Sequence, residues 1–168
     1  MNLIDNQIEI IPVHNSTDQR KALITYHVTG WCLANANLVG HYGASQGCYA
    51  LPNGDRMGSD SCVIFNARWN ALTNVQQGEA FPPVVPNFVI ELRSHSDLPQ
   101  YIHNRMLRWI NNGVEESWSI DHFINPPEVR IYTFNANTNQ VTWQILVNPT
   151  QVTSQVLNGF VMNMQGIF

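Results

Sequence analysis

The chain has 168 residues, 44% of them hydrophobic, which suits a single domain over residues 1–168 with one substantial core. Eight Lys and Arg residues against twelve Asp and Glu residues give a net charge of −4, a poor electrostatic footprint for non-specific binding to a phosphate backbone. No apolar run approaches the ~18 residues of a membrane span, and the first residues lack the features of a signal peptide. We therefore expect a cytoplasmic protein with no membrane contact. Three cysteines without C-x-x-C spacing indicate neither a disulfide framework nor a zinc site.

The first half of the chain predicts a strand, a long helix and several strands joined by hairpins. Alternation predicts a strand over residues 7–13, which ends near Pro12. Residues 15–37 predict a helix, capped by Ser16 or Thr17, with these apolar residues at near-helical spacing: Leu23, Ile24, Val28, Trp31 and Leu33. Turn residues then separate strands expected near 38–42, 47–51 and 61–65, and a short helix is expected over 67–73.

The second half predicts a strand, a helix and a meander. The proline-rich stretch 79–86 excludes regular structure, and a strand within 86–92 follows it. A helix is predicted over 96–113, capped by Ser96 or Asp97, with Pro99 in its first turn and Gly113 at its end. Its expected buried stripe consists of Leu98, Ile102, Met106 and Trp109. Strands are expected over 116–121, 128–134 and 140–146, then a short extended tail over 156–164. This order predicts an α+β fold with a central mixed sheet flanked by helices.

Glu91 lies inside the apolar run Phe88-Val89-Ile90-Glu91-Leu92, where an ionised carboxylate is costly unless it is paired. One interpretation is that the strand turns this residue to solvent near a sheet edge. The other is that Glu91 faces a cleft and binds a hard divalent cation, which prefers carboxylate and carbonyl oxygens. Asp60, directly before the apolar strand 61–65, supplies a second carboxylate in a similar setting.

Three blocks of sequence carry a resemblance to a known family: LPNGDRMGSDSCVIFNARWNAL (51–72), FPPVVPNFVIELRSHSD (81–97) and RMLRWINNGVEESWSID (105–121). In this order they resemble the Uma family of restriction-endonuclease-like proteins, abundant in cyanobacteria. The segment VLNGFV (156–161) matches the closing block of that family. The resemblance implies a PD-(D/E)xK nuclease fold, a restriction-endonuclease-like core with a mixed sheet between helices.

The resemblance also implies the residues of a nuclease site. Asp60 matches the motif Asp and Glu91 the motif acid, and with the backbone carbonyl of Leu92 they would hold Mg²⁺ or Mn²⁺. Arg93 stands where the simplest motif has lysine, and Arg105 stands where many members of the family take their lysine from the following helix. Such a site would hydrolyse DNA phosphodiester bonds, because the metal activates a water and stabilises charge on the phosphate.

The chain departs from the family pattern at three places. Ser59 replaces a proline, Asn87 replaces an acid before the strand, and neither expected lysine position holds a lysine. An arginine can stabilise phosphate charge, but it stays protonated and cannot act as a base. Lys21, the only lysine, is the one possible substitute, and the alternative for it is a solvated place on a helix surface. Arg105 borders the buried stripe of its helix, and its alternative is an exposed salt bridge.

Two functions remain open at this level. The chain is either a Mg²⁺-dependent endodeoxyribonuclease, or a nuclease-fold protein with an impaired site that acts as a binding or self-association module. The intact Asp60 and Glu91 favour the enzyme, whereas the acidic net charge and the arginines at the lysine positions favour the module. The resemblance further implies DNA as a partner and a homodimer, because many proteins of this fold pair to cut both strands.

Overall fold

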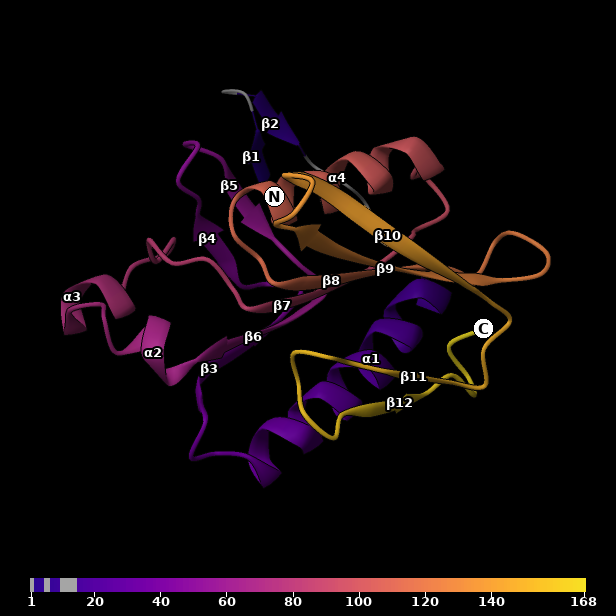
Figure 1. Cartoon of the computed structure of the whole chain (residues 1–168), viewed down its shortest axis with the longest axis horizontal. Coiled ribbons are helices and arrows are strands. Elements are labelled where there is room, and N and C mark those ends of the chain that lie inside the picture. The colour runs from indigo at the N-terminus through magenta and orange to yellow at the C-terminus, as the bar shows by residue number, and fades with distance from the viewer. Residues whose placement is uncertain (1, 5–6, 10–14) are drawn as a thin grey trace.

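The computed structural model describes residues 2–4, 7–9 and 15–168, and a six-stranded sheet lies at its centre (Figure 1). The helices are α1 (Asn15–Ala34), α2 (Asn66–Trp69), α3 (Asn74–Gln77) and α4 (Pro99–Asn111). The strands of the central sheet are β3 (Val39–Ala44), β6 (Ser61–Phe65), β7 (Phe88–Leu92), β8 (Glu116–Asp121), β9 (Glu128–Asn135) and β10 (Gln140–Val147). The remaining strands are β1 (Asn2–Ile4), β2 (Gln7–Glu9), β4 (Cys48–Ala50), β5 (Arg56–Gly58), β11 (Gln151–Thr153) and β12 (Val161–Asn163).

The central sheet has the order β10-β9-β8-β7-β6-β3 and is mixed. Strands β7 and β8 are parallel, joined by the crossover helix α4, and the other neighbours are antiparallel. The sheet is therefore the α+β arrangement that the sequence predicts. Strand β7 lies between β6 and β8, and all five of its residues are buried.

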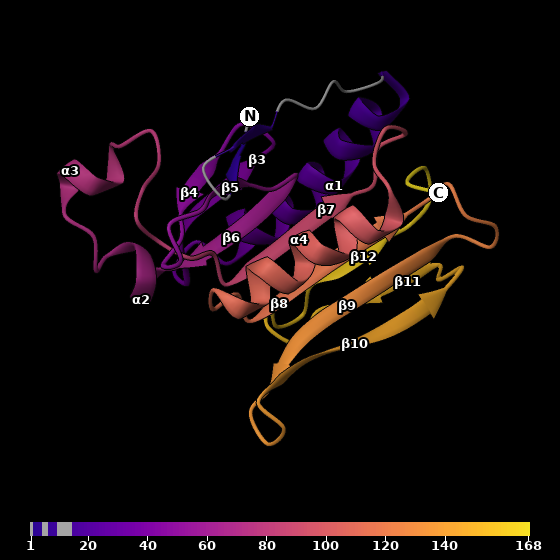
Figure 2. The same ribbon diagram turned by 90° about the horizontal axis from the view of Figure 1, so that it is seen from above.

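Helices cover the two faces of this sheet, α1 on one side and α4 on the other (Figures 1 and 2). Alternation along β7 divides its side chains between two cores. Phe88, Ile90 and Leu92 pack in the core that α1 covers, and Val89 packs in the core that α4 covers. Glu91, two residues from Val89, therefore points toward α4.

Smaller sheets complete the structure. Strands β2, β1, β5 and β4 form a four-stranded sheet, and β11 pairs with β12 near the chain end. The β11–β12 unit adds Val152, Leu157, Phe160 and Met162 to the α1 core. The side chain of Glu116, fully buried at the start of β8, links this unit to the sheet, because it accepts hydrogen bonds from Nε1 of Trp118 (2.8 Å) and the backbone N–H of Gln155 (3.0 Å).

Several expected boundaries differ from the structure. The strand expected over 7–13 is present at 7–9, and residues 10–14 lie outside the described residues. Strand β3 pairs with β6, although the β4–β5 hairpin lies between them in the sequence. Hairpins between consecutive strands were expected. Leu33 and Leu98, placed in buried stripes, are 64% and 71% exposed.

The expected cap of α4 is wrong. The N-cap position is Leu98, without a side-chain cap, and Pro99 begins the helix. The Asp97 carboxylate instead accepts hydrogen bonds from the backbone N–H (3.0 Å) and Oγ (2.6 Å) of Ser94. A local turn therefore uses the acceptor that the helix was expected to use. The helix does end as expected, since Gly113 adopts a φ of 104°, which favours glycine.

None of the helices in the described part of the chain combines the length and apolar character needed to cross a membrane.

Replacing Glu116 with alanine should lower the free energy of unfolding by about 2–4 kcal/mol, because the buried indole N–H of Trp118 and the partly buried backbone N–H of Gln155 lose their acceptor. Chemical denaturation of both proteins measures this difference. Glu79→Ala, at an exposed carboxylate, is the matched control and should change stability by less than about 0.5 kcal/mol. An equally small effect at Glu116 would show that the link between β8 and the β11–β12 unit does not stabilise the fold.

Candidate active site

Two carboxylates lie side by side where β6 begins and β7 ends. Ser61 pairs with Ile90 in the antiparallel ladder, and the backbone N–H of Asp60 donates to the carbonyl of Ile90 (3.1 Å). This register places Asp60 next to Glu91. Both residues are buried, with only 6% and 5% of their surfaces exposed. The interpretation that Glu91 faces solvent at a sheet edge is therefore wrong.

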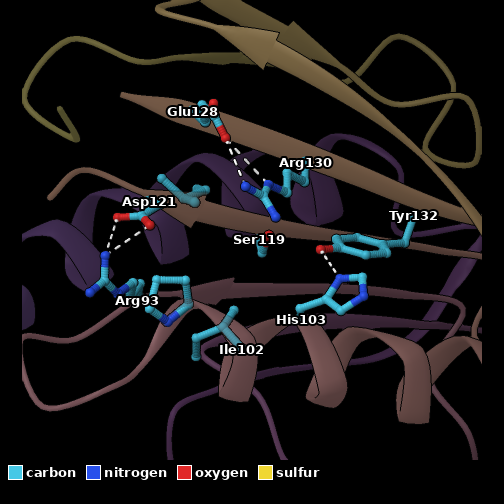
Figure 3. Close-up of a pocket in the computed structure, with 10 residues that line it drawn as sticks. Arg93, Ile102, His103, Ser119, Asp121, Glu128, Arg130 and Tyr132 are labelled. Atoms are coloured by element: carbon cyan, nitrogen blue, oxygen red, sulfur yellow. Dashed lines mark hydrogen bonds and ion pairs between the residues drawn. The ribbon is translucent and has the colours of Figure 1, made fainter. Parts of the chain in front are cut away.

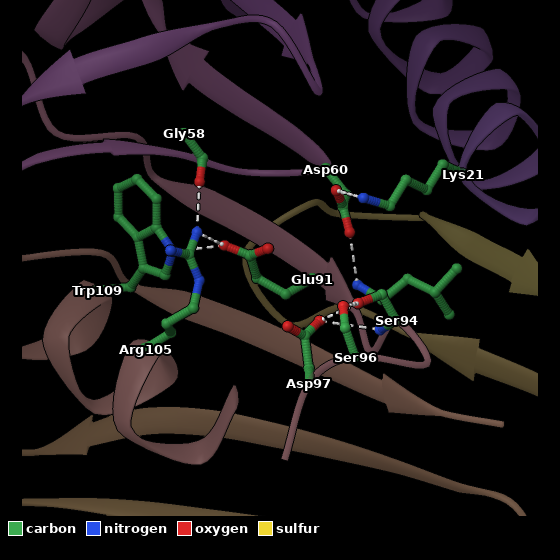
Figure 4. Close-up of polar contacts among 10 residues, drawn as sticks. Lys21, Gly58, Asp60, Glu91, Ser94, Ser96, Asp97, Arg105 and Trp109 are labelled. Atoms are coloured by element: carbon green, nitrogen blue, oxygen red, sulfur yellow. Dashed lines mark hydrogen bonds and ion pairs between the residues drawn. The ribbon is translucent and has the colours of Figure 1, made fainter. Parts of the chain in front are cut away.

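Asp60 is held by a lysine from one helix and a main-chain donor from β7 (Figure 4). Its Oδ1 lies 2.6 Å from Nζ of Lys21, and its Oδ2 accepts the backbone N–H of Leu92 at 2.8 Å. The side chain of Lys21 is only 14% exposed, so the solvated alternative for this lysine is also wrong. The bond from Leu92 fixes the Asp60 carboxylate at the end of β7.

Glu91 is held by two side chains from the other helix (Figure 4). Its Oε1 accepts from Nη2 of Arg105 at 2.6 Å and from Nε1 of Trp109 at 3.1 Å. Arg105 and Trp109 are four residues apart on α4, so they lie on the same helix face. Nη2 of Arg105 also donates to the carbonyl of Gly58 (2.6 Å), which fixes the guanidinium between α4 and β5. The exposed alternative for Arg105 is wrong, since its side chain is 6% exposed.

Burial governs the electrostatics of this cluster. Burial raises the pKa of Asp60, although the ion pair with Lys21 and the N–H of Leu92 oppose the shift. Burial also raises the pKa of Glu91; Arg105 opposes this shift and the nearby negative charge of Asp60 adds to it. Burial acts to lower the pKa of Arg105, but the Glu91 carboxylate and Tyr101 together outweigh it and the net direction is upward. The two carboxylates interact with each other, and each is stabilised by its own cation.

Arg93 lies apart from this cluster. Its Nη1 binds both carboxylate oxygens of Asp121 (2.9 and 3.0 Å), and its Nε donates to the carbonyl of Asp97. It lines a small pocket between α4 and strands β8 and β9, together with residues such as His103 and Arg130 (Figure 3). Of the sequence-predicted residues, the structure thus brings together Asp60, Glu91, Leu92, Lys21 and Arg105, and gives Arg93 a different partner.

Asn87, which stands where the family has an acid, lies at the opposite end of β7 from Glu91. Its Oδ1 accepts the backbone N–H of Phe65 (2.8 Å) and its Nδ2 donates to Oε1 of Glu115 (2.6 Å). The amide thus ties strand ends together, and its substitution for an acid leaves the Asp60–Glu91 pair intact.

Two contacts of the cluster were not predicted from the sequence. Trp109 was assigned to the helix stripe but not to Glu91, and Lys21 was not assigned to the buried stripe of its helix. A spacing signal was available for Lys21: it lies four residues after Thr17 and three before Ile24, and both of these are buried. Polar residues that continue such a stripe indicate a buried polar partner.

Comparison with known proteins agrees with this fold. The sequence model of the Uma2 family, described as "Putative restriction endonuclease", matches residues 1–165. A crystal structure described as a putative nuclease belonging to DUF820 from Anabaena variabilis is similar to this chain, with a TM-score of 0.77 and 12% sequence identity. The similarity covers 99% of this chain and 88% of that one, and at this identity it shows the fold alone. No curated protein matches the chain. Because the match spans nearly all of the sequence, the chain belongs to the Uma2 family of restriction-endonuclease-like proteins.

Proposed function

We propose that this protein is a metal-dependent nuclease that hydrolyses phosphodiester bonds in DNA. One observation carries the proposal: Asp60 and Glu91 are buried side by side at the end of one strand pair, each bound to a cation from a different helix. Two buried carboxylates are costly, so a fold that keeps them together indicates a use for them. A homodimer and a cytoplasmic location belong to the same proposal.

The donor set of this cluster suits Mg²⁺ or Mn²⁺. Hard divalent cations prefer oxygen ligands, and the chain offers the carboxylates of Asp60 and Glu91, with the main-chain carbonyl of Leu92 as a third oxygen. The described hydrogen bonds to Glu91 both end on Oε1, which leaves Oε2 to face a metal. When bound, the metal would supply Lewis-acid stabilisation of the phosphate and a more acidic water.

Lys21 and Arg105 then take different roles. Lys21 binds Oδ1 of Asp60, where an ammonium group is placed to orient a water or a phosphate oxygen. A lysine amine can also release a proton, which a guanidinium does not do. Arg105 holds Glu91 in position and adds a permanent positive charge that can stabilise a phosphate in the transition state. We therefore assign the role of the motif lysine to Lys21, and Arg93 has no role near the carboxylates.

A second function is favoured by the charge balance of the same cluster. The two carboxylates and the two cations sum to zero, so the site is electrically complete without a metal. A divalent cation adds two positive charges, and an anionic phosphodiester, which carries one negative charge, would offset one of them. If metal and substrate do not bind together, the neutral cluster has no need of a metal. The charge balance then supports the alternative, a nuclease-fold protein that acts as a binding or self-association module.

Metal-dependent cleavage tests the enzyme against the module. The protein should nick supercoiled plasmid DNA with Mg²⁺ or Mn²⁺, and Asp60→Asn or Glu91→Gln should reduce the rate at least ~100-fold, because each removes a metal ligand. Glu128→Gln is the matched control, since this carboxylate pairs with Arg130 away from the cluster, and it should keep the activity. If the unmodified protein cuts neither supercoiled nor single-stranded DNA with either metal, the module is the better description.

Lys21→Met should give a stability loss that depends on pH. The substitution leaves Asp60 buried without its cation, and breaking a buried pair costs about 3–5 kcal/mol near neutral pH. The pKa of Asp60, already raised by burial, then rises further above its unfolded value, so the folded state holds the proton more tightly. The stability of the variant is therefore closest to that of the unmodified protein below the unfolded pKa of Asp60, ~3.9. The loss of stability grows as pH rises through the folded pKa of Asp60.

Denaturant unfolding of the variant and the unmodified protein at about pH 4.5 and about pH 7.5 measures this difference. When both proteins carry Asp60→Asn, the acid is absent from each, and the stability difference between the proteins with and without Lys21→Met should no longer vary with pH. A loss of the same size at both pH values in Lys21→Met would mean that Lys21 does not interact with an ionised Asp60.

Binding to duplex DNA should show an unusually weak salt dependence. All eight basic residues lie in the described part of the chain, and six of them pair with carboxylates: Lys21, Arg68, Arg93, Arg105, Arg108 and Arg130. Arg20 donates to the carbonyls of Ser16 and Ile167, and Arg56 lies over the ring of Phe81. We expect a plot of log K against log salt with a slope of about −1 to −2, measured by fluorescence anisotropy in EDTA. A slope steeper than about −5 would reveal a phosphate-binding surface that this pairing does not predict.

A further inference from the structure

One edge of the central sheet is open. Strand β10 ends the sheet, and its outer edge pairs with none of the other strands in residues 2–4, 7–9 and 15–168. Its eight residues, QVTWQILV, include no Asp, Glu, Lys, Arg or Pro. Proteins usually protect a long edge strand with charges, proline or a bulge, because its free N–H and C=O groups pair readily with another strand. Strand β10 has none of these protections within its bounds.

The opposite edge of the same sheet is protected. Strand β3 has a register shift between Val39 and His41, which marks a bulge or irregularity, and helix α2 packs against it. A side chain at Gly40, inside the shift, would collide with Cβ of Trp69, which lies 2.4 Å from the position of such a Cβ. The edge of the sheet is thus irregular and partly covered at β3, and regular and unpaired in the described residues at β10.

An exposed apolar stripe accompanies the open edge. Trp143, Ile145 and Val147 alternate along β10 and are 46%, 44% and 57% exposed. Trp143 contacts the His103 ring of α4 at 4.9 Å between centroids, so the stripe lies on the α4 side of the sheet. Phe134, paired with Val141 in the ladder and 46% exposed, extends the stripe onto β9.

The charges next to this stripe are balanced. The β9 partners of Ile145 and Val147 are Arg130 and Glu128, and these two residues form an ion pair at 3.1 Å. Strand β10 itself carries no charge. A second strand can therefore approach without meeting a charge of its own sign, even when it belongs to a chain with a net charge of −4.

We propose that a second copy of this chain pairs its β10 with this edge, antiparallel and about a two-fold axis. An uncharged strand edge is complementary to itself, and a two-fold axis uses the same surface on both copies. If the two-fold axis is perpendicular to the sheet, the α4 helices of both copies lie on the same face of the joined sheet. Odd-numbered residues of one β10 then lie opposite odd-numbered residues of the other. The apolar stripes of the two copies then lie side by side, and their contact buries apolar surface from water.

The assembly stops at two copies. Pairing at β10 joins the two sheets into one, and the outer edges of that sheet are the two β3 strands with their register shift and α2 cover. Closure at the dimer follows, because the register shift and the packing of α2 oppose the addition of a third copy at β3. This inference rests on the homodimer of the proposed function and assigns it a surface, but it is independent of the nuclease activity, since none of its residues belongs to the Asp60–Glu91 cluster.

Ile145→Lys tests the proposal. Sedimentation over a range of micromolar concentrations should give twice the chain mass for the unmodified protein and the chain mass for the variant, because the variant places a charged lysine from each copy within the apolar stripe of the contact. Val75→Lys, at a residue 77% exposed on α3, is the matched control and should stay dimeric. Val147→Lys provides a second variant, and circular dichroism checks that each protein is folded.

The result expected is loss of the dimer in the folded β10 variants only. A monomeric unmodified protein at all concentrations would overturn the proposal. So would a dimer that persists in both folded β10 variants, because the two copies would then meet on another surface.

Discussion

The structure depends on the cost of burying two carboxylates at the end of one strand pair. Asp60 and Glu91 have lost nearly all their contact with water, and each is stabilised by a cation at 2.6 Å. An unpaired buried charge would cost several kcal/mol, so neither cation can be lost without a comparable penalty. The two cations come from α1 and α4, the helices that cover opposite faces of the sheet. The positions of both helices are therefore coupled to the same pair of acids.

This arrangement also explains how few cations remain for the surface. Six of the eight basic residues pair with carboxylates of the same chain, and two of those pairs form the buried cluster. A nuclease built in this way would bind its substrate through the site and not through a broad positive surface. It would also depend on the phosphate to offset part of the charge of a metal. The neutral charge of the site and the lack of a broad positive surface thus have the same cause, the pairing of most basic residues with carboxylates.

Much of the fold was predictable, because its strands have local signals. The apolar runs and turns around β6, β7 and the β8–β10 meander located those strands to within a few residues. Predictions failed where a tertiary contact outweighed a local preference. Asp97 accepts hydrogen bonds from Ser94 in a turn and does not cap helix α4. Strand β3 pairs with β6 and not with β4, the next strand in the sequence. Periodicity alone could not show that Leu33 and Leu98 face solvent, since it defines a helix face but not how far the neighbouring elements extend.

For the candidate site, the sequence by itself determined the acids and their place at strand ends. A carboxylate within the apolar run of β7 and another directly before β6 are visible in the residues, because burying them has an obvious cost. Which cations balance them was decided only by the tertiary structure. Lys21 is 39 residues from Asp60 along the chain and Arg105 is 14 from Glu91, and α1 and α4 pack on opposite faces of the sheet. Arg93, two residues after Glu91, instead pairs with Asp121 of β8. Ion pairing acts through a few ångströms of space, and the separation of two residues along the chain does not specify that distance.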